Sequence, residues 1–524
     1  MIEFFSSNLN LERYSFIMEK FDIVIIGGGI NGCGIARDAA GRGLKVLVCE
    51  KNDLGSATSS SSTKLIHGGL RYLENFQFRL VKEALREREI LLNLAPHIIS
   101  EMRFILPHQQ NLRPSWFIRI GLFLYDNLGS RKFLNKSKFV DLTNHIAGNA
   151  LKKNYNKGFE YSDCWVDDSR LVILNAQDAH LNGARVLPRT SCLNATPRKG
   201  NWNLTLRDED NKNSFEIETR AIINATGPWS LDFLSKVVSA TKSNGLRLVR
   251  GSHIIVPKKF DHNRAYIFQN TDKRIVFAIP YEQHYTLIGT TDVEHKTGPD
   301  NVQVSKEEIQ YLCDSVNVYF ETRVHLTDVI HSYSGVRPLL YNKATIAQNT
   351  TRDYSIELEL HDEAPLLNVF GGKITTYRKL AESALEKLNS LLTITHGSWT
   401  NTVPLPGGAF KPCEFNDRKH DIYASKTWLE RSIIDRLFSS YGTNADKILH
   451  KINNFQEMGQ YFGAGLYECE INYLRRFEWA RSADDILWRR SKLGLVFSKN
   501  EYENLEKWLE NNPLQLENTI NARK

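Results

Sequence analysis

The sequence predicts an α/β protein, α+β overall, with a parallel-sheet domain, an antiparallel sheet and a helical C-terminal domain. Residues 21–51 have the strand, glycine turn, helix and strand pattern of a βαβ unit. Residues 251–293 contain several short β-rich segments of the kind that form antiparallel strands. After VPLPGGAF (403–410), a linker-like stretch with prolines and glycines, the composition becomes helical.

The βαβ unit carries a glycine pattern suited to a dinucleotide. The apolar run Ile23–Ile26 is typical of a buried parallel strand. The GxGxxG that follows permits a tight turn, close approach to a pyrophosphate and close helix packing, and a helix from about Ile30 to Gly43 directs its amides at the pyrophosphate. An acid 18 residues after the last glycine can accept a hydrogen bond from a ribose hydroxyl. The cofactor residues expected here are Gly27, Gly29, Ile30, Asn31, Gly32 and Glu50.

Two later strand ends distinguish FAD from NAD. AIINATGPWS (221–230) is an apolar strand that runs into Ala225, Thr226 and Gly227, as in FAD-binding Rossmann proteins of the glutathione reductase type. NVFGGKITTYRKLAE (368–382) is a strand, a glycine pair and a helix whose first turn suits the polar end of an isoalloxazine ring. Three such strand ends predict one long cofactor, FAD, in a Rossmann-like domain. The residues expected at the ring end are Gly371, Gly372, Lys373, Ile374 and Thr375.

The stretch TSSSSTKLIHGGLRYL (58–73) is predicted to be a cofactor loop. Four consecutive serines are typical of a flexible linker. This run, however, follows the second strand and Glu50, so it lies along the outside of the dinucleotide. Small hydroxyl side chains leave room for a cofactor and can hydrogen-bond its phosphates and ribityl chain.

Positive charge is concentrated in one window of the chain. The formal net charge is +7, and between Met102 and Val140 seven basic residues face only Asp126, which gives +6. The same window contains WFIRIGLFLYDNL (116–128), and basic residues around an aromatic-rich helix suit a membrane surface. A buried helix with basic flanks is the alternative. No run of ~18 apolar residues occurs, so a transmembrane helix is not expected.

The seven cysteines are scattered without a CxxC pair, so no metal site and no thioredoxin-like chemistry are expected. This usage suggests a reducing compartment. The segment MIEFFSSNLNLERYSFIMEK lacks the features of a signal peptide. Because the first strand begins near Phe21, Met18 is the predicted start.

Several longer strings resemble the bacterial FAD-dependent (aerobic) glycerol-3-phosphate dehydrogenase family. They include IIGGGINGCGIARDAAGRGL, SSSSTKLIHGGLRYLE, GFEYSDCWVDDSRLV, NATGPW, GSHIIVP, IGTTDVE, YSGVRPL, VFGGKITTYRKLAE and, near the C-terminus, WARSADDILWRRSKLGL. The resemblance implies a fold related to D-amino-acid oxidase and oxidation of sn-glycerol 3-phosphate to dihydroxyacetone phosphate, with hydride transfer from C2 to flavin N5. It also implies a cytoplasmic enzyme attached peripherally to the inner face of the cell membrane, with membrane quinone as electron acceptor.

The resemblance also implies site residues. In the 58–73 loop, Thr58, Ser59, Ser62 and Lys64 would contact the flavin, and His67, Gly68 and Gly69 would approach its ring. Packing of His67 in the core is the alternative. A phosphate dianion needs fixed cations, and arginine pairs bidentately with phosphate oxygens. The substrate residues implied are Arg71, Tyr72, Arg337, Arg352 and Lys373.

We predict His253 in GSHIIVP as the proton acceptor, because a neutral imidazole titrates near working pH. Arg337 has an unperturbed pKa above ~12, so we assign it to holding the substrate and stabilising developing negative charge. A core role for His253 is the alternative, and the base stays open between His253, His67 and a water. Asp292 in GTTDVE is interpreted as structural and left out of the site.

We expect three parts in the chain. Residues 1–17 form an extension, and 18–400 form the oxidoreductase domain, with a flavin part at about 18–90, 150–230 and 330–398 and a substrate part at about 91–149 and 231–330. Residues 401–524 form a helical cap without recognisable chemistry. In this cap, Ser482 and Asp485 have the spacing of a capping box.

Three alternative functions stand beside this one. An oxidase would use the same substrate with oxygen as acceptor, and sequence separates it poorly from a dehydrogenase. An amino-acid oxidase of the same fold needs one arginine and an apolar pocket, whereas four cations indicate a dianion. RNA binding is disfavoured because the positive charge lies in one apolar window instead of a broad basic and aromatic face. The oligomeric state stays open, with a homodimer as one option.

Overall fold

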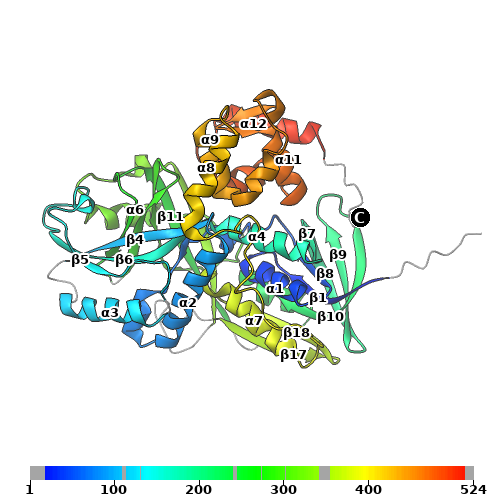
Figure 1. The fold of residues 1–524 in the computed structure, drawn as a ribbon. Helices are drawn as coiled ribbons and strands as arrows, with labels where there is room; N and C mark the ends of the chain where they lie inside the picture. The colour runs from blue at the N-terminus through cyan, green and yellow to red at the C-terminus, as the bar shows by residue number, and fades with distance from the viewer. Residues whose placement is uncertain are drawn as a thin grey trace, which may run out of the picture.

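The computed structural model describes residues 18–108, 114–129, 131–239, 245–272, 274–300, 302–340 and 354–513. Two sheets lie side by side, and the C-terminal helices form a separate layer above their junction (Figure 1). Among the described residues, no helix combines the length and apolarity needed to cross a bilayer.

The first sheet has a parallel centre formed by β-branched, fully buried strands. Its strand order is β17-β18-β10-β1-β2-β7, and the hairpin of β8 and β9 continues from β10. All pairs from β18 to β7 are parallel, whereas β17 is antiparallel to β18. The strands are β1 (Glu19–Ile26), β2 (Val46–Glu50), β7 (Arg185–Pro188), β8 (Thr190–Arg198), β9 (Asn201–Asp208), β10 (Ser214–Asn224), β17 (Ser355–His361) and β18 (Ala364–Phe370).

Helix α1 packs on both α4 and α7. The bounds are α1 (Ile30–Gly41), α4 (Asp168–Leu181) and α7 (Tyr377–Leu388), and the short α5 (Ser230–Lys236) follows β10. The apolar side chains of α1 and α7 form one buried cluster with Ile23, Ile25 and Val48 of the central strands. Helix α1 ends at Gly41, two residues before the expected end.

The second sheet is mostly antiparallel, with the order β15-β11-β14-β13-β12-β4-β6-β3 and with β16 on β11 and β5 on β6. Three of its strands, β3, β6 and β16, lie in ranges that we expected in the flavin part. The strands are β3 (Leu65–Ile66), β4 (Ile99–His108), β5 (Lys138–Asp141), β6 (Lys157–Val166), β11 (Leu246–Pro257), β12 (Arg264–Gln269), β13 (Ile275–Tyr281), β14 (Tyr285–Gly289), β15 (Val293–Glu294) and β16 (His331–Leu340).

Three helices accompany this sheet: α2 (Phe78–Leu94), α3 (Ser115–Asn127) and α6 (Lys306–Asn317). Helix α3 lies at the edge of the molecule, on the side away from the C-terminal helices (Figure 1). Helix α6 begins at a complete capping box of Ser305 and Glu308.

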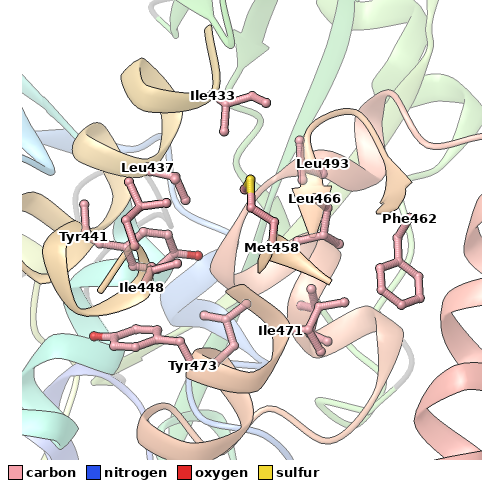
Figure 2. Close-up of a cluster of buried hydrophobic side chains, with 14 of the residues drawn as sticks. Ile433, Leu437, Tyr441, Ile448, Met458, Phe462, Leu466, Ile471, Tyr473 and Leu493 are labelled. Carbon is pink, nitrogen blue, oxygen red and sulfur yellow. The ribbon is translucent and has the colours of Figure 1, made fainter. Parts of the chain in front are cut away.

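The C-terminal part has its own core. Apolar side chains such as Leu437, Tyr441 and Ile471 gather between its helices (Figure 2). Reciprocal hydrogen bonds between Ser482 and Asp485 confirm the expected capping box, and the turn that follows, Asp485–Arg490, is π-helical. The elements are α8 (Phe415–Ser425), α9 (Arg431–Tyr441), α10 (Ala445–Ile448), β19 (Tyr461–Gly463), β20 (Leu466–Tyr467), α11 (Glu468–Phe477) and α12 (Lys499–Asn511).

Candidate active site

A cavity of about 410 Å³ lies at the carboxyl edge of the first sheet. Because β1, β2, β10 and β18 are parallel, their carboxyl ends meet at this edge. Segments from all four strand ends line the cavity: Gly27 after β1, Glu50 in β2, Ala225, Thr226 and Gly227 after β10, and Gly371 and Gly372 after β18. The structure therefore brings together the three glycine-rich strand ends singled out in the sequence.

The first glycine turn leaves no room for side chains. Gly27 has a φ of +110°, and a Cβ there would lie 2.6 Å from the carbonyl oxygen of Ala225. A Cβ on Gly32 would lie 1.9 Å from the carbonyl oxygen of Gly27. The first turn of α1 therefore reaches the cavity with bare backbone at Gly29, and its amides suit an anionic ligand.

Two polar side chains of this wall are fixed by backbone contacts. The carboxylate of Glu50 accepts hydrogen bonds from the amides of Gly28 (2.8 Å) and Asn52 (2.9 Å), while burial raises its pKa. Asn31 donates from Nδ2 to the carbonyl oxygen of Gly371 (3.1 Å). Its Oδ1 is buried and has no hydrogen-bond partner in the described part of the chain, so it can accept from a ligand.

The serine-rich loop divides into two groups. Thr58 and Ser59 line the cavity, and Ser59 Oγ accepts from the amide of Ile30 at 3.0 Å. Ser62 and Lys64 instead reach the first residue of α4, because Asp168 accepts from Ser62 Oγ and from Lys64 Nζ, both at 2.7 Å. The structure thus shows this stretch as an ordered loop, tied at one end to α1 and at the other to α4.

The ring end of the predicted cofactor site is also tied together. Thr375 Oγ1 accepts from the amide of His67 at 3.2 Å, which joins the serine-rich loop to the segment after β18. The amide of Gly68 donates to the hydroxyl of Tyr125 at 2.8 Å. Ile374 packs on the apolar cluster that contains Ile30.

A second cavity of about 110 Å³ lies beside this end. Its lining includes His67, Gly69, Arg71, Tyr72, Thr290 and Asp292. Lys373 follows directly after the glycine pair of the first cavity, and its Nζ lies 3.7 Å from the ring centroid of Tyr72. Arg71, Tyr72 and Lys373 are therefore close to one another, whereas Arg352 lies outside the described residues.

Arg337 reaches this second cavity through Asp292, an acid that the sequence patterns did not place in the site. Its Nη1 lies 2.5 Å from Oδ1 of Asp292, and its Nη2 donates to Thr290 Oγ1 at 3.3 Å. Both partners line the cavity. Asp292 lies between β14, which ends at Gly289, and β15, which begins at Val293, and this place between two strands was the available signal in the sequence.

His253 lies behind the cavity walls. Its side chain is fully buried, stacks on Tyr333 with a centroid distance of 4.9 Å and lines neither of the two cavities. Its Nε2 shares a 2.9 Å hydrogen bond with Thr63 Oγ1, a residue that sequence reasoning missed. Burial, then the cations Arg337 and Lys64, hold the pKa of His253 well below its usual value, so the imidazole is neutral.

A tryptophan from the segment after β10 contributes to the lining of the first cavity. Trp229 Nε1 donates to Asp300 at 2.9 Å, and Lys51 Nζ lies 4.3 Å from a Trp229 ring centroid. All three residues line the cavity. They come from three separate segments, and no local pattern in the sequence connects them.

Comparison with known proteins identifies the family. Residues 22–378 match the model described as FAD dependent oxidoreductase, and residues 398–511 match the C-terminal domain of alpha-glycerophosphate oxidase. The chain is 48% identical to a glycerol-3-phosphate dehydrogenase of Pseudomonas aeruginosa, with 94% of this chain and 96% of the relative covered. The chain belongs to the FAD-dependent glycerol-3-phosphate dehydrogenase family.

Two further relatives and one solved structure are similar to the chain. The aerobic glycerol-3-phosphate dehydrogenase of Escherichia coli is 47% identical, and the D-erythritol 1-phosphate dehydrogenase of Brucella abortus is 46% identical; each comparison covers 94% of this chain and 98% of the relative. The FAD complex of a Bacillus halodurans glycerol-3-phosphate dehydrogenase has the same fold, with a TM-score of 0.73, 24% identity and 94% of both chains covered.

The cofactor is therefore FAD, and the predictions of family, fold and cofactor are confirmed. The cavity residues fit this group. The bare turn at Gly27–Gly32 suits its pyrophosphate and Glu50 its ribose, and Asn31 Oδ1 offers an unused acceptor. The contacts of individual residues with FAD, and the roles of His253 and Arg337, stay predictions.

Proposed function

We propose that the chain oxidises sn-glycerol 3-phosphate at C2 to dihydroxyacetone phosphate and passes the electrons to membrane quinone. The observation that carries the proposal is the second cavity beside the ring end of the FAD site, which one cation lines and whose lining residues two further cations contact. Arg71 lines this cavity, Lys373 lies against its Tyr72, and Arg337 joins it through Asp292. Such a cluster suits a phosphate dianion, and the names of the relatives supply the polyol phosphate.

When bound, FAD supplies the hydride acceptor for the C2 hydrogen. The protein has to bind the phosphate, orient C2 and take the proton of the C2 hydroxyl. We assign phosphate binding to Arg71 and Lys373. We assign stabilisation of the developing oxyanion to Arg337, because Asp292 holds its guanidinium group in place.

We assign proton acceptance to His253. It is neutral, which a base requires. Because it lines neither cavity, the proton would reach its Nε2 through the hydroxyl of Thr63, with which it shares a hydrogen bond. His67 is the second candidate, because it lines the cavity itself. Variants of the two histidines distinguish them.

The surface of α3 supports attachment to a membrane. One face of this helix packs on the protein through Ile118, Leu122 and Tyr125. Its other side exposes Trp116 (64%), Phe117 (43%), Ile120 (51%) and Phe123 (66%). Aromatic and aliphatic side chains exposed in this number, with Arg119 among them, suit the headgroup boundary of an anionic bilayer. This arrangement favours an acceptor dissolved in the membrane over oxygen.

An anaerobic titration tests the reaction. The flavin absorbance band of the purified protein should bleach on addition of sn-glycerol 3-phosphate and remain with glycerol or glycine, because neither carries a phosphate. The same titration is repeated with D-erythritol 1-phosphate, because one relative is named for oxidation of this compound. Bleaching by this polyol phosphate alone would replace the proposed substrate, and bleaching by glycine would indicate an amino-acid oxidase.

A further inference from the structure

The C-terminal part reaches the FAD site through buried ion pairs. Asp53 lies in the loop after β2, between the cavity residues Asn52 and Gly55. Arg490 donates two hydrogen bonds to its carboxylate, one of them at 2.9 Å to Oδ1. Arg489 Nε adds a third at 2.5 Å. Asp53 is 3% exposed and Arg490 is fully buried, so solvent does not screen this contact.

The two arginines are themselves fixed by the π-helical turn that carries them. Arg490 Nη2 donates to the carbonyl oxygen of Glu478 at 2.6 Å, and Arg489 Nη2 donates to Asp485 at 2.5 Å. Asp485 in turn accepts from Arg189 at 2.8 Å, directly after β7. The turn is therefore held by residues of the C-terminal part and by Arg189 of the segment after β7.

The loop that Arg490 and Arg489 hold is a wall of the FAD cavity. Gly55 donates from its amide to the carbonyl oxygen of Gly28 at 3.0 Å, and the amide of Ser56 donates to the carbonyl oxygen of Asp53 at 3.2 Å. Movement of Asp53 would therefore be transmitted to the glycine turn of α1. In the described part of the chain, the only side-chain ion pairs of Asp53 are those with Arg489 and Arg490.

The C-terminal part also holds the other end of the serine-rich loop. Arg170 forms a fully buried bidentate pair with Glu478, and Lys492 lies 3.2 Å from Asp167. Arg170 lies in the first turn of α4, and Asp167 is the N-cap of that helix. Both are next to Asp168, which accepts hydrogen bonds from Ser62 and Lys64. In Figure 1, α4 lies directly below the C-terminal helices.

We propose that Arg490, with Arg489, is a positioning residue for FAD, which acts through Asp53 to keep the 51–57 loop in its binding conformation. The C-terminal part then fixes the conformation of the 51–57 loop in addition to packing against the rest of the protein. If the loop keeps this conformation for only ~10% of the time in a variant, the apparent FAD affinity falls ~10-fold. The proposal does not depend on the substrate or the electron acceptor.

The test compares Arg490→Met with Arg436→Met. Arg436 forms a matched bidentate pair with Glu470, at 2.7 Å on both arms, inside the C-terminal part and away from the FAD loop. The dissociation constant of FAD is measured by fluorescence titration of the deflavinated full chain. Hydrogen exchange of residues 51–57 in the same apoprotein provides a second readout that needs no cofactor.

Arg490→Met should weaken FAD binding ~10-fold or more and speed exchange in the 51–57 loop. Arg436→Met should lower thermal stability while both readouts stay at parental values. Equal FAD affinity in Arg490→Met and parent, or an equal loss in both variants, would overturn the proposal. If Arg490→Met does not fold, the partly exposed Arg489→Met takes its place in the same comparison and is judged by the same two outcomes, with a smaller loss expected because Asp53 keeps Arg490.

Discussion

Asp292 Oδ1 lies 2.5 Å from Nη1 of Arg337, and this contact joins the segment after β14 to strand β16. The two strands do not pair with each other; both pair with β11, which lies between them. Gly251 of β11 provides the space, because a Cβ there would lie 2.6 Å from Nη2 of Arg337. The guanidinium therefore crosses the central strand and is held beside the second cavity.

Asp292→Asn should lower kcat/KM for sn-glycerol 3-phosphate about 10- to 100-fold. The carboxylate contact to a guanidinium contributes about 1.5–3 kcal/mol, and the amide that replaces it can no longer orient Arg337 electrostatically. The measurement is steady-state kinetics with an artificial electron acceptor. Glu294→Gln is the control, because Glu294 pairs with the neighbouring Arg247 near the surface. Unchanged kinetics in Asp292→Asn would remove Asp292 from the site.

The pH profile distinguishes His253 from His67. Because the pKa of His253 lies well below 6.5, wild-type kcat/KM should stay level as pH falls through 6.5 and decline only at lower pH. His253→Asn should lower kcat about 100-fold or more and abolish that acidic limb, while His67→Asn should retain it. The opposite assignment follows if the limb disappears in His67→Asn and survives in His253→Asn.

Lys64 is predicted by the resemblance to contact the flavin, yet its ammonium pairs with Asp168, with both side chains buried. Lys64→Met leaves Asp168 without this partner and should lower the free energy of unfolding of the apoprotein by about 3 kcal/mol. The double variant Lys64→Met/Asp168→Asn should recover part of this loss. Denaturant unfolding measures both. A stable Lys64→Met that has lost only its FAD affinity would instead indicate direct contact with the cofactor.

His97 should make the protein sensitive to acid. Burial, then the nearby Arg170, lower its pKa to about 3, and both ring nitrogens lack a hydrogen-bond partner among the described residues. Below about pH 6.5 the unfolded chain binds a proton at this position and the folded chain does not, so stability falls as pH falls towards 3.

His97→Gln should therefore reduce the dependence of the unfolding free energy on pH by up to ~1.4 kcal/mol per pH unit in that range. Urea unfolding at several pH values between 7 and 4 measures the slope. His420→Gln, an exposed histidine of the C-terminal part, serves as control. Identical slopes in the parent and His97→Gln would contradict the burial of a neutral His97.

Removal of the exposed apolar side chains of α3 should weaken membrane binding. The variant Trp116→Ser/Ile120→Ser/Phe123→Ser should bind vesicles of anionic phospholipid at least ~10-fold more weakly, because each large apolar side chain contributes about 1.5–3 kcal/mol when buried. Cosedimentation measures this. Leu181→Ser, at an exposed leucine of α4, is the control. Full binding by the triple variant would exclude α3 as the membrane contact.

The parts of the fold and site that local sequence patterns encode were predictable. The turn at Gly27–Gly32 and the strand ends at Ala225 and Gly371 each follow a short apolar strand, so their type and position are visible in a single segment. Parallel strands then bring those ends to one edge of the sheet. This combination was sufficient for FAD and the Rossmann-like domain.

Contacts that depend on register between distant strands were not predictable. Asp292 meets Arg337 only because both flanking strands pair with β11, and the partners of Asp53 lie more than 400 residues later. Lys64 and Ser62 belong to a loop whose composition suits a cofactor, but their partner Asp168 becomes visible only when α4 is packed beside that loop. Side-chain pairing of this kind is a property of the folded chain.

Stopped-flow reduction of the enzyme-bound flavin, under anaerobic conditions, is the sharpest test of the proposed reaction. The proposal predicts that sn-glycerol 3-phosphate bleaches the flavin in a single turnover and that deuterium at C2 slows this step, because the C2 hydrogen is the one transferred. Bleaching at the same rate with either isotope and with glycerol would contradict both the reaction at C2 and the need for the cationic cavity.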